Sequence, residues 1–138
     1  MHFHSVDDPR ALYAGGLGPP FPMTTLRVFH SAVEPTIRDW AATIGCPTDA
    51  RVTAELQGQA ASREAGHTAT RYLWSPCREG AGVVLWKFTG TGHVWPGGLQ
   101  EYLPRLIGPS TALVDANLEM WRFFQRFQLD NDKPGRER

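Results

Sequence analysis

The sequence predicts an α/β domain, because strand-like runs and amphipathic helices alternate along its 138 residues. Residues 68–74 and 82–88 have the length and apolar composition of strands, and the short connection between them favours an antiparallel pair. Residues 33–44 and 115–125 place apolar side chains at helical spacing. The second helix is rich in aromatic residues and needs a sheet to cover, so we expect helices and strands to share one core.

Composition and charge limit the classes of partner. With 41% hydrophobic and 20% charged residues, the chain is typical of a folded domain. We expect one domain over residues 1–129 and a disordered tail over residues 130–138. Fourteen basic residues balance fourteen acidic ones, so no nucleic-acid or membrane partner is expected. We also expect no membrane span and no signal peptide.

The first strand is predicted over residues 1–6 and is followed by two carboxylates, Asp7 and Asp8. Carboxylates at strand ends often carry chemistry, although the same residues also form local Asx turns. His2 and His4 lie two positions apart and should face the same side of this strand. No third ligand lies at a suitable spacing, so we expect no metal here, and nothing in the chain indicates a cofactor.

Local signals give the expected helix ends. The first helix begins with a Ser31–Glu34 capping box, or near Glu34 because Pro35 is typical of a first helical position. It should end at Gly45. A further strand is predicted within residues 52–56. The second helix has Asp115 as its N-cap. Its expected buried face is marked by Val114, Leu118, Trp121 and either Phe124 or Gln125, and Phe123 and Phe127 widen it.

The chain contains two cysteines, Cys46 and Cys77. One disulfide that closes the loop between them and two free buried thiols are both compatible with this count. A single pair of cysteines does not indicate a compartment.

The segment TGTGHVWPGG, residues 89–98, follows the strand predicted over residues 82–88. Gly90 and Gly92 permit positive φ and close backbone approach, and the Pro96–Gly97 pair forces a turn. This loop should therefore hold a fixed shape and present His93 outward. A turn histidine that bonds only to its own loop is the alternative to a functional one.

Residues 4–16 (HSVDDPRALYAGG) and 90–98 (GTGHVWPGG) resemble two motifs of the polyhydroxybutyrate depolymerase and feruloyl esterase family of α/β-hydrolases. The first is similar to H-G-x-x-D-x-x-V-P-Y-x-G-G and would make Asp8 the catalytic acid. The second is similar to G-G-G-H-x-W-P-G-G and would make His93 the catalytic base. The resemblance implies the C-terminal half of an α/β-hydrolase fold, with a partial, mostly parallel sheet and flanking helices. It suggests Tyr13 and Trp95 as substrate-binding residues.

The nucleophile of that family is absent from the sequence. The serine should stand in a Gly-x-Ser-x-Gly elbow before the acid, and none of the five serines has that frame: Ser5, Ser31, Ser62, Ser75 and Ser110. Within the acid motif, Ser5 replaces a glycine, Leu12 a proline and Ala14 an acidic residue. We therefore expect the C-terminal portion of a serine carboxylester hydrolase that is inactive alone.

Other functions and partners stay open at this level. The chain could be a non-catalytic hydrolase remnant, or a small binding domain whose Trp74, Trp86 and Trp95 line an aromatic groove. An ester is the expected substrate if an N-terminal segment completes the site, and self-association through an exposed sheet edge is expected otherwise. Related esterases are often secreted, but this sequence indicates no compartment.

Overall fold

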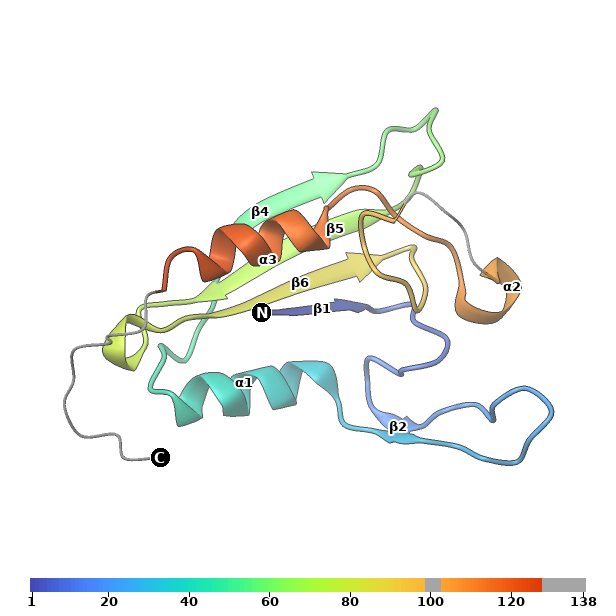
Figure 1. Cartoon of the computed structure of the whole chain (residues 1–138), viewed down its shortest axis with the longest axis horizontal. Helices are drawn as coiled ribbons and strands as arrows, with labels where there is room; N and C mark the ends of the chain where they lie inside the picture. Colours follow the sequence, from blue (N-terminus) through green and yellow to red (C-terminus); the bar gives the residue numbers. More distant parts are fainter. Residues whose placement is uncertain (99–102, 128–138) are drawn as a thin grey trace.

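The computed structural model describes residues 1–98 and 103–127. The tail expected over residues 130–138 lies outside this range. Figure 1 shows a curved sheet accompanied by helices. The elements in chain order are β1 (His2–Ser5), β2 (Gly16–Leu17), β3 (Phe29–His30), α1 (Val33–Thr43), β4 (Arg51–Gln57), β5 (Thr68–Trp74), a 3-10 turn (Arg78–Gly80), β6 (Val83–Thr89), α2 (Pro104–Ile107) and α3 (Ala116–Phe124).

The main sheet has the strand order β1-β6-β5-β4, and β2 and β3 form a separate small hairpin. The antiparallel pairing of β5 with β6 is confirmed, and so is a strand around residues 52–56. The expectation of a mostly parallel sheet is wrong, because β1 pairs in parallel with β6 while β4–β5 and β5–β6 are antiparallel. The connections over residues 58–67 and 75–82 are too short for parallel crossovers.

Strand β6 is the buried centre of the fold. Its residues alternate between two cores, as a strand covered on both faces requires. Val83 and Leu85 pack with Ile37 of α1, whereas Trp86 and Phe88 pack with Phe123 of α3. This alternation places the two helices on opposite faces of the sheet. Strand β1 lies at one edge and is paired only with β6 among the described residues.

Helix α1 begins at Val33 without the capping box expected from Ser31 and Glu34. Its N-cap is Ala32, and no side chain caps the helix. The Glu34 carboxylate instead accepts a hydrogen bond from Lys87 Nζ on β6, at 2.8 Å. The Glu34 side chain is therefore engaged in a tertiary ion pair and does not cap the helix. The predicted stop is confirmed, since Gly45 follows the helix with φ of 67°.

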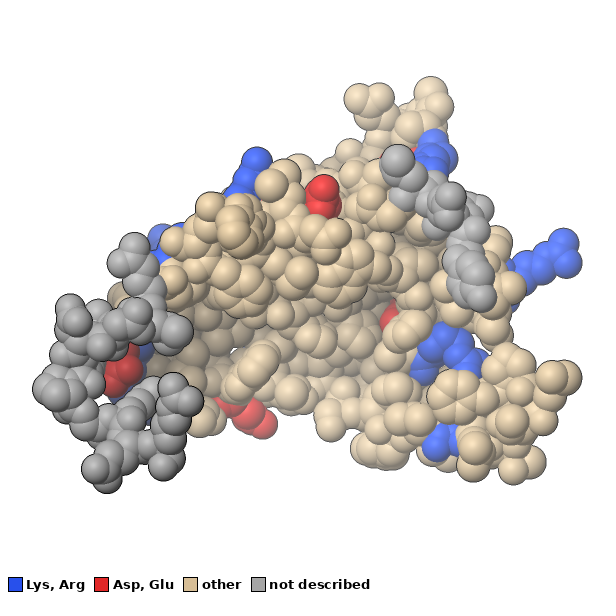
Figure 2. All heavy atoms as spheres, viewed as in Figure 1, with Lys and Arg blue, Asp and Glu red and all other residues tan. Residues whose placement is uncertain are grey.

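Helix α3 has the expected N-cap, because Asp115 Oδ1 accepts a hydrogen bond from Leu118 N at 3.0 Å. The prediction of its buried face is confirmed for Val114 and Phe123 and wrong for Leu118, Trp121, Phe124 and Phe127. Val114, Ala116 and Phe123 are buried, and the exposed apolar residues are Leu118, Trp121 and Phe124. Apolar residues occur around most of this helix, so spacing alone did not fix its rotation. Most of the surface over α3 in Figure 2 belongs to uncharged residues.

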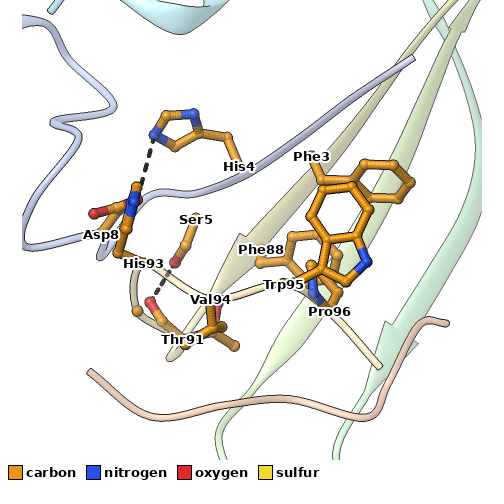
Figure 3. Close-up of a pocket in the computed structure, with 11 residues that line it drawn as sticks. Phe3, His4, Ser5, Asp8, Phe88, Thr91, His93, Val94, Trp95 and Pro96 are labelled. Atoms are coloured by element: carbon orange, nitrogen blue, oxygen red, sulfur yellow. Dashed lines mark hydrogen bonds and ion pairs between the residues drawn. The ribbon is translucent and has the colours of Figure 1, made fainter. Parts of the chain in front are cut away.

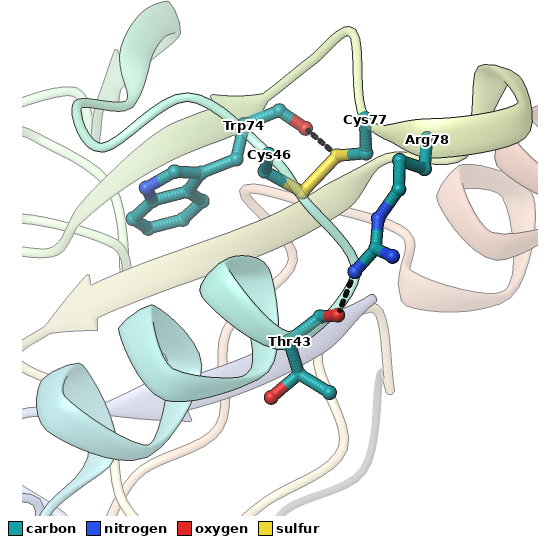
Figure 4. Close-up of a disulfide and its surroundings, with 5 residues drawn as sticks. All are labelled: Thr43, Cys46, Trp74, Cys77 and Arg78. Carbon is teal, nitrogen blue, oxygen red and sulfur yellow. Dashed lines mark hydrogen bonds between the residues drawn. A yellow bond between two sulfur atoms is a disulfide. The ribbon is translucent and has the colours of Figure 1, made fainter.

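Cys46 and Cys77 form a disulfide, with their Cα atoms 4.0 Å apart (Figure 4). The bond joins the end of α1 to the segment that leads into β6. A neighbouring hydrogen bond from Arg78 to the Thr43 carbonyl, at 2.6 Å, links the same two segments. Of the two alternatives, the structure therefore contains the disulfide and not the two free thiols.

Replacing both cysteines, Cys46→Ser with Cys77→Ser, should lower the free energy of unfolding by about 3–4 kcal/mol. The reason is that the bond spans 31 positions and restricts the unfolded chain. Urea denaturation of the two proteins measures the difference. A reductant should weaken the natural chain and leave the double variant unchanged, and equal stabilities of the two oxidised proteins would contradict the prediction.

Candidate functional site

A cavity of about 270 Å³ lies where β1 and β6 end at the same edge of the sheet. Figure 3 shows its residues, which come from the two strands and from the loops that follow them. They are Phe3, His4, Ser5, Asp8, Phe88, Thr91, Gly92, His93, Val94, Trp95 and Pro96. The cavity therefore combines aromatic rings with both residues assigned to an acid–base pair by the resemblance.

Asp8 and His93 meet at this cavity, although 85 positions separate them in the sequence. Asp8 Oδ2 lies 2.8 Å from His93 Nδ1. Asp8 Oδ1 accepts hydrogen bonds from the backbone N–H groups of Arg10 and Ala11, both at 2.8 Å. The Asp8 side chain is only 6% exposed, so these N–H groups replace water as partners of its carboxylate.

The ionised carboxylate can only accept hydrogen bonds, so it selects the His93 tautomer that carries its proton on Nδ1. The other nitrogen, Nε2, then holds a free lone pair. The imidazole side chain is 55% exposed, and Nε2 has no hydrogen-bond partner among the residues that the structure describes. This is the arrangement of a general base that is ready to take a proton.

Asp7 has a different role from Asp8. Its Oδ2 accepts a hydrogen bond from Gly90 N at 2.7 Å, which ties the end of β1 to the end of β6. Gly90 has φ of 76°, the left-handed conformation expected from its sequence. The two adjacent carboxylates thus diverge, one toward the backbone and the other toward His93.

The His93 loop packs against a distant segment instead of bonding only to itself. His93 N donates to the Ile107 carbonyl at 2.5 Å, and Gly92 N donates to the Pro109 carbonyl at 2.9 Å. A Cβ atom on Gly92 would stand 1.8 Å from the Ile107 oxygen. Only glycine permits this approach, and the approach fixes the position of the histidine backbone.

Glu64 holds the segment around Thr111 in place, a role that the sequence did not predict. Its carboxylate accepts hydrogen bonds from Thr111 Oγ1 at 2.7 Å and Ala112 N at 3.0 Å, and it lies 3.0 Å from His67 Nδ1. Burial alone would raise the pKa of Glu64, but these partners outweigh it and the pKa is lowered. No local motif signals this contact, because the partners lie 47 and 48 positions away.

His4 places a second imidazole beside Asp8. Its Nε2 lies 2.8 Å from the Ala11 carbonyl, to which it donates, and 3.8 Å from Asp8 Oδ2. His2 Nε2 lies 3.2 Å from His4 Nδ1, which agrees with their predicted common face. Ala11 also donates its N–H to Asp8. Through its hydrogen bond to Ala11, His4 therefore supports the turn that binds the Asp8 carboxylate. The described residues contain no group of three or more side chains arranged for a metal ion.

The other residues proposed from the sequence fall in different places. Trp95 lines the cavity, and its ring centroid lies 5.7 Å from that of Phe3. Its indole N–H donates a hydrogen bond to Asn117 Oδ1 at 3.1 Å. Tyr13 does not line this cavity, since its hydroxyl donates to Glu34 at 3.1 Å. Burial and the Glu34 carboxylate raise the pKa of Tyr13.

An aromatic groove formed by Trp74, Trp86 and Trp95 is absent. Trp74 is buried on the α1 face of the sheet and Trp86 on the α3 face. The sheet therefore lies between the two side chains. Trp74 is paired with Val83 and Trp86 with Arg71, and because successive side chains of a strand point to opposite faces, these two positions face opposite sides. The groove interpretation is wrong.

Comparisons with protein-family models, curated proteins and solved structures give no match to this chain. Within the described residues, no helix is long and apolar enough to cross a membrane.

Asp8→Asn should reverse the tautomer of His93. The amide can donate its N–H to Nδ1, which moves the imidazole proton to Nε2 and removes the free lone pair. Nitrogen chemical shifts of the His93 ring, recorded by NMR at a pH where the ring is neutral, report the change. Asp39→Asn on the outer face of α1 is the matched control. Finding the proton on Nε2 in the natural chain would refute the assignment.

Glu64→Gln should lower the free energy of unfolding near neutral pH by about 1–3 kcal/mol, since it removes a partly buried charge that accepts hydrogen bonds. The Glu64 pKa is lowered by folding, so its contribution is complete above the unfolded value of 4.5 and is lost as the pH falls through the folded value. Urea midpoints across this range measure the effect. The difference between variant and natural chain should shrink on acidification, and Glu55→Gln on exposed β4 should change little.

Proposed function

We propose that this chain carries the acid and the base of a serine-type carboxylester hydrolase, with Asp8 and His93 in these roles. The observation that supports the proposal is the 2.8 Å hydrogen bond between Asp8 and His93 Nδ1, which leaves Nε2 free beside a cavity. The residue pattern at residues 90–98 agrees with the same family of esterases.

In this proposal, a serine from a polypeptide segment other than residues 1–138 supplies the nucleophile. Of the serines near the pair, Ser5 is buried and its hydroxyl donates to the Thr91 carbonyl at 2.5 Å. No serine, threonine or cysteine bonds to His93 among the described residues. The pair therefore needs a hydroxyl group that these residues do not provide.

The proton moves as follows in the completed site. His93 Nε2 takes the proton of the serine hydroxyl while the serine oxygen attacks the ester carbonyl. The resulting imidazolium is stabilised by Asp8, and it returns the proton to the departing alcohol. An acyl-enzyme remains, and a water molecule releases the acid by the same route, with Nε2 again taking and returning one proton.

The surroundings of His93 fit an ester with an apolar portion. Phe3 and Trp95 form one wall of the cavity that contains the acid–base pair. A second hollow of about 260 Å³ borders the histidine and includes Phe21 and Val28 from the β2–β3 hairpin region. Apolar walls on two sides of the base would accept the acyl or alcohol group and exclude water around the reacting atoms.

Coexpression with the polypeptide encoded immediately upstream should produce hydrolysis of p-nitrophenyl acetate. His93→Ala or Asp8→Ala should reduce the rate of the completed enzyme by about 10⁴-fold, because a triad acts as one unit. Asp39→Ala is the matched control and should retain full activity. Residues 1–138 alone should hydrolyse this ester no faster than their own His93→Ala variant.

A serine-directed fluorophosphonate locates the nucleophile independently of turnover. It should label the added polypeptide and leave residues 1–138 unlabelled. His93-dependent hydrolysis by residues 1–138 alone would mean that the nucleophile lies within this chain. An upstream polypeptide without a reactive serine, and no activity in the mixture, would count against the esterase proposal.

A further inference from the structure

The β2–β3 hairpin, residues 16–30, projects from the end of the molecule where α2 also lies (Figure 1). Hydrogen bonds hold its shape beyond the two short strands. Phe21 N donates to the Leu26 carbonyl at 2.9 Å, and the Arg10 guanidinium donates to the Pro20 carbonyl at 3.2 Å. The projection is therefore an ordered hairpin that is tied to the body of the protein.

The hairpin exposes large apolar side chains to solvent. Met23 and Phe29 are 103% and 74% exposed, and Leu103 at the start of α2 adds a further exposed side chain at the same end of the molecule. A large apolar patch of this kind marks an interaction surface in soluble proteins. The exposed apolar side chains of the hairpin are Leu17, Phe21, Met23, Leu26, Val28 and Phe29.

Met23 and Leu103 display these side chains from an unfavourable backbone conformation. Their φ angles are 58° and 47°, in the left-handed region that few residues other than glycine adopt. Met23 stands in a turn closed by a hydrogen bond from Thr24 N to the Phe21 carbonyl, at 3.0 Å. Glycine is the usual residue where such a turn has positive φ. Neither exposed side chain gains packing in return, and strain without such a gain is typical of functional segments.

The charged residues of the hairpin and of α2 are basic. Residues 16–30 contain Arg27 and no acidic residue, and Pro104–Ile107 contains Arg105 and no acidic residue. Both arginines are exposed, and Figure 2 shows Lys and Arg atoms at this end of the molecule. The expectation of no membrane partner used the net charge of the whole chain, which does not report this local excess of positive charge.

An apolar tip flanked by arginines is complementary to the surface of an anionic lipid bilayer. Apolar side chains enter the boundary between headgroups and acyl chains, while arginines bind the negatively charged headgroups. Met23 is fully exposed, so its new surroundings must enclose it from all sides. Fluid acyl chains do this around a projecting tip.

We propose that the β2–β3 hairpin and α2 bind an anionic lipid bilayer, with Met23 and Leu26 inserted and Arg27 and Arg105 at the headgroups. The proposal does not depend on the Asp8–His93 pair. His93 nevertheless borders the hollow that the hairpin and α2 share, so binding would bring the acid–base pair close to the lipid.

Cosedimentation of residues 1–138 with lipid vesicles tests the proposal. Mixed vesicles of phosphatidylcholine and phosphatidylserine should bind the chain, and added salt or phosphatidylcholine alone should weaken binding. Met23→Ser with Leu26→Ser should weaken binding about tenfold or more, because the inserted apolar surface is lost. Arg27→Ala with Arg105→Ala should weaken binding to mixed vesicles about tenfold and leave binding to phosphatidylcholine alone unchanged.

Matched controls change the same residue types on other surfaces. Trp121→Ser on exposed α3 and Arg51→Ala on exposed β4 should bind mixed vesicles as the natural chain does. His93→Ala should also bind normally, so failure of the esterase proposal does not affect this test. Circular dichroism of each variant confirms that it remains folded.

Four results would overturn the proposal. The chain binds neither kind of vesicle, or it binds both equally well. The Met23→Ser, Leu26→Ser variant binds like the natural chain, or Trp121→Ser loses binding, which would assign the lipid contact to α3. A methyl NMR signal of Met23 that shifts with the upstream polypeptide and not with vesicles would identify the hairpin as a protein interface instead.

Discussion

The parallel pairing of β1 with β6 is the constraint on which the candidate site depends. Its register sets Ser5 opposite Phe88, so both strands end at the same edge of the sheet. Asp8 follows one strand end and His93 the other, and a hydrogen bond of 2.8 Å joins them. A shift of one residue in this register would turn the side chains of β1 to the opposite faces and separate the pair. Phe3 of β1 packs against the core that contains Trp86 and Phe88, and this contact favours the observed register.

The site is supported from several directions before any substrate arrives. Asp7 fixes Gly90, Gly92 packs on the Ile107 carbonyl, and Glu64 anchors the segment around Thr111. Each contact removes a backbone motion that would otherwise compete with the catalytic geometry. Preorganisation of this kind is what makes a base effective, because the cost of ordering has already been met during folding.

The two faces of the sheet carry different chemistry. The Asp8–His93 cavity presents an unpaired base next to aromatic rings, which suits proton transfer on an ester. A cavity of about 390 Å³ beside α1 instead contains charges that are paired with one another, as Glu34 is with Lys87. The exposed apolar side chains of α3 form a third type of surface. Because β6 contributes residues to both cavities, its alternation is what keeps them apart.

Local signals in the sequence predict the alternation of strands and helices, the stop of α1 at Gly45 and the Asp115 cap. The two motifs that carry the family resemblance select Asp8 and His93, which the structure brings together. These features depend on local backbone preferences and on short motifs, which neighbouring residues specify. Tertiary structure decided the rest. The rotation of α3, the use of Glu34 by Lys87 instead of a capping box, the parallel pairing of β1 with β6 and the anchor role of Glu64 all depend on partners far along the chain. Local spacing contains no information about such partners, because burial and pairing are set by the packing of the whole chain.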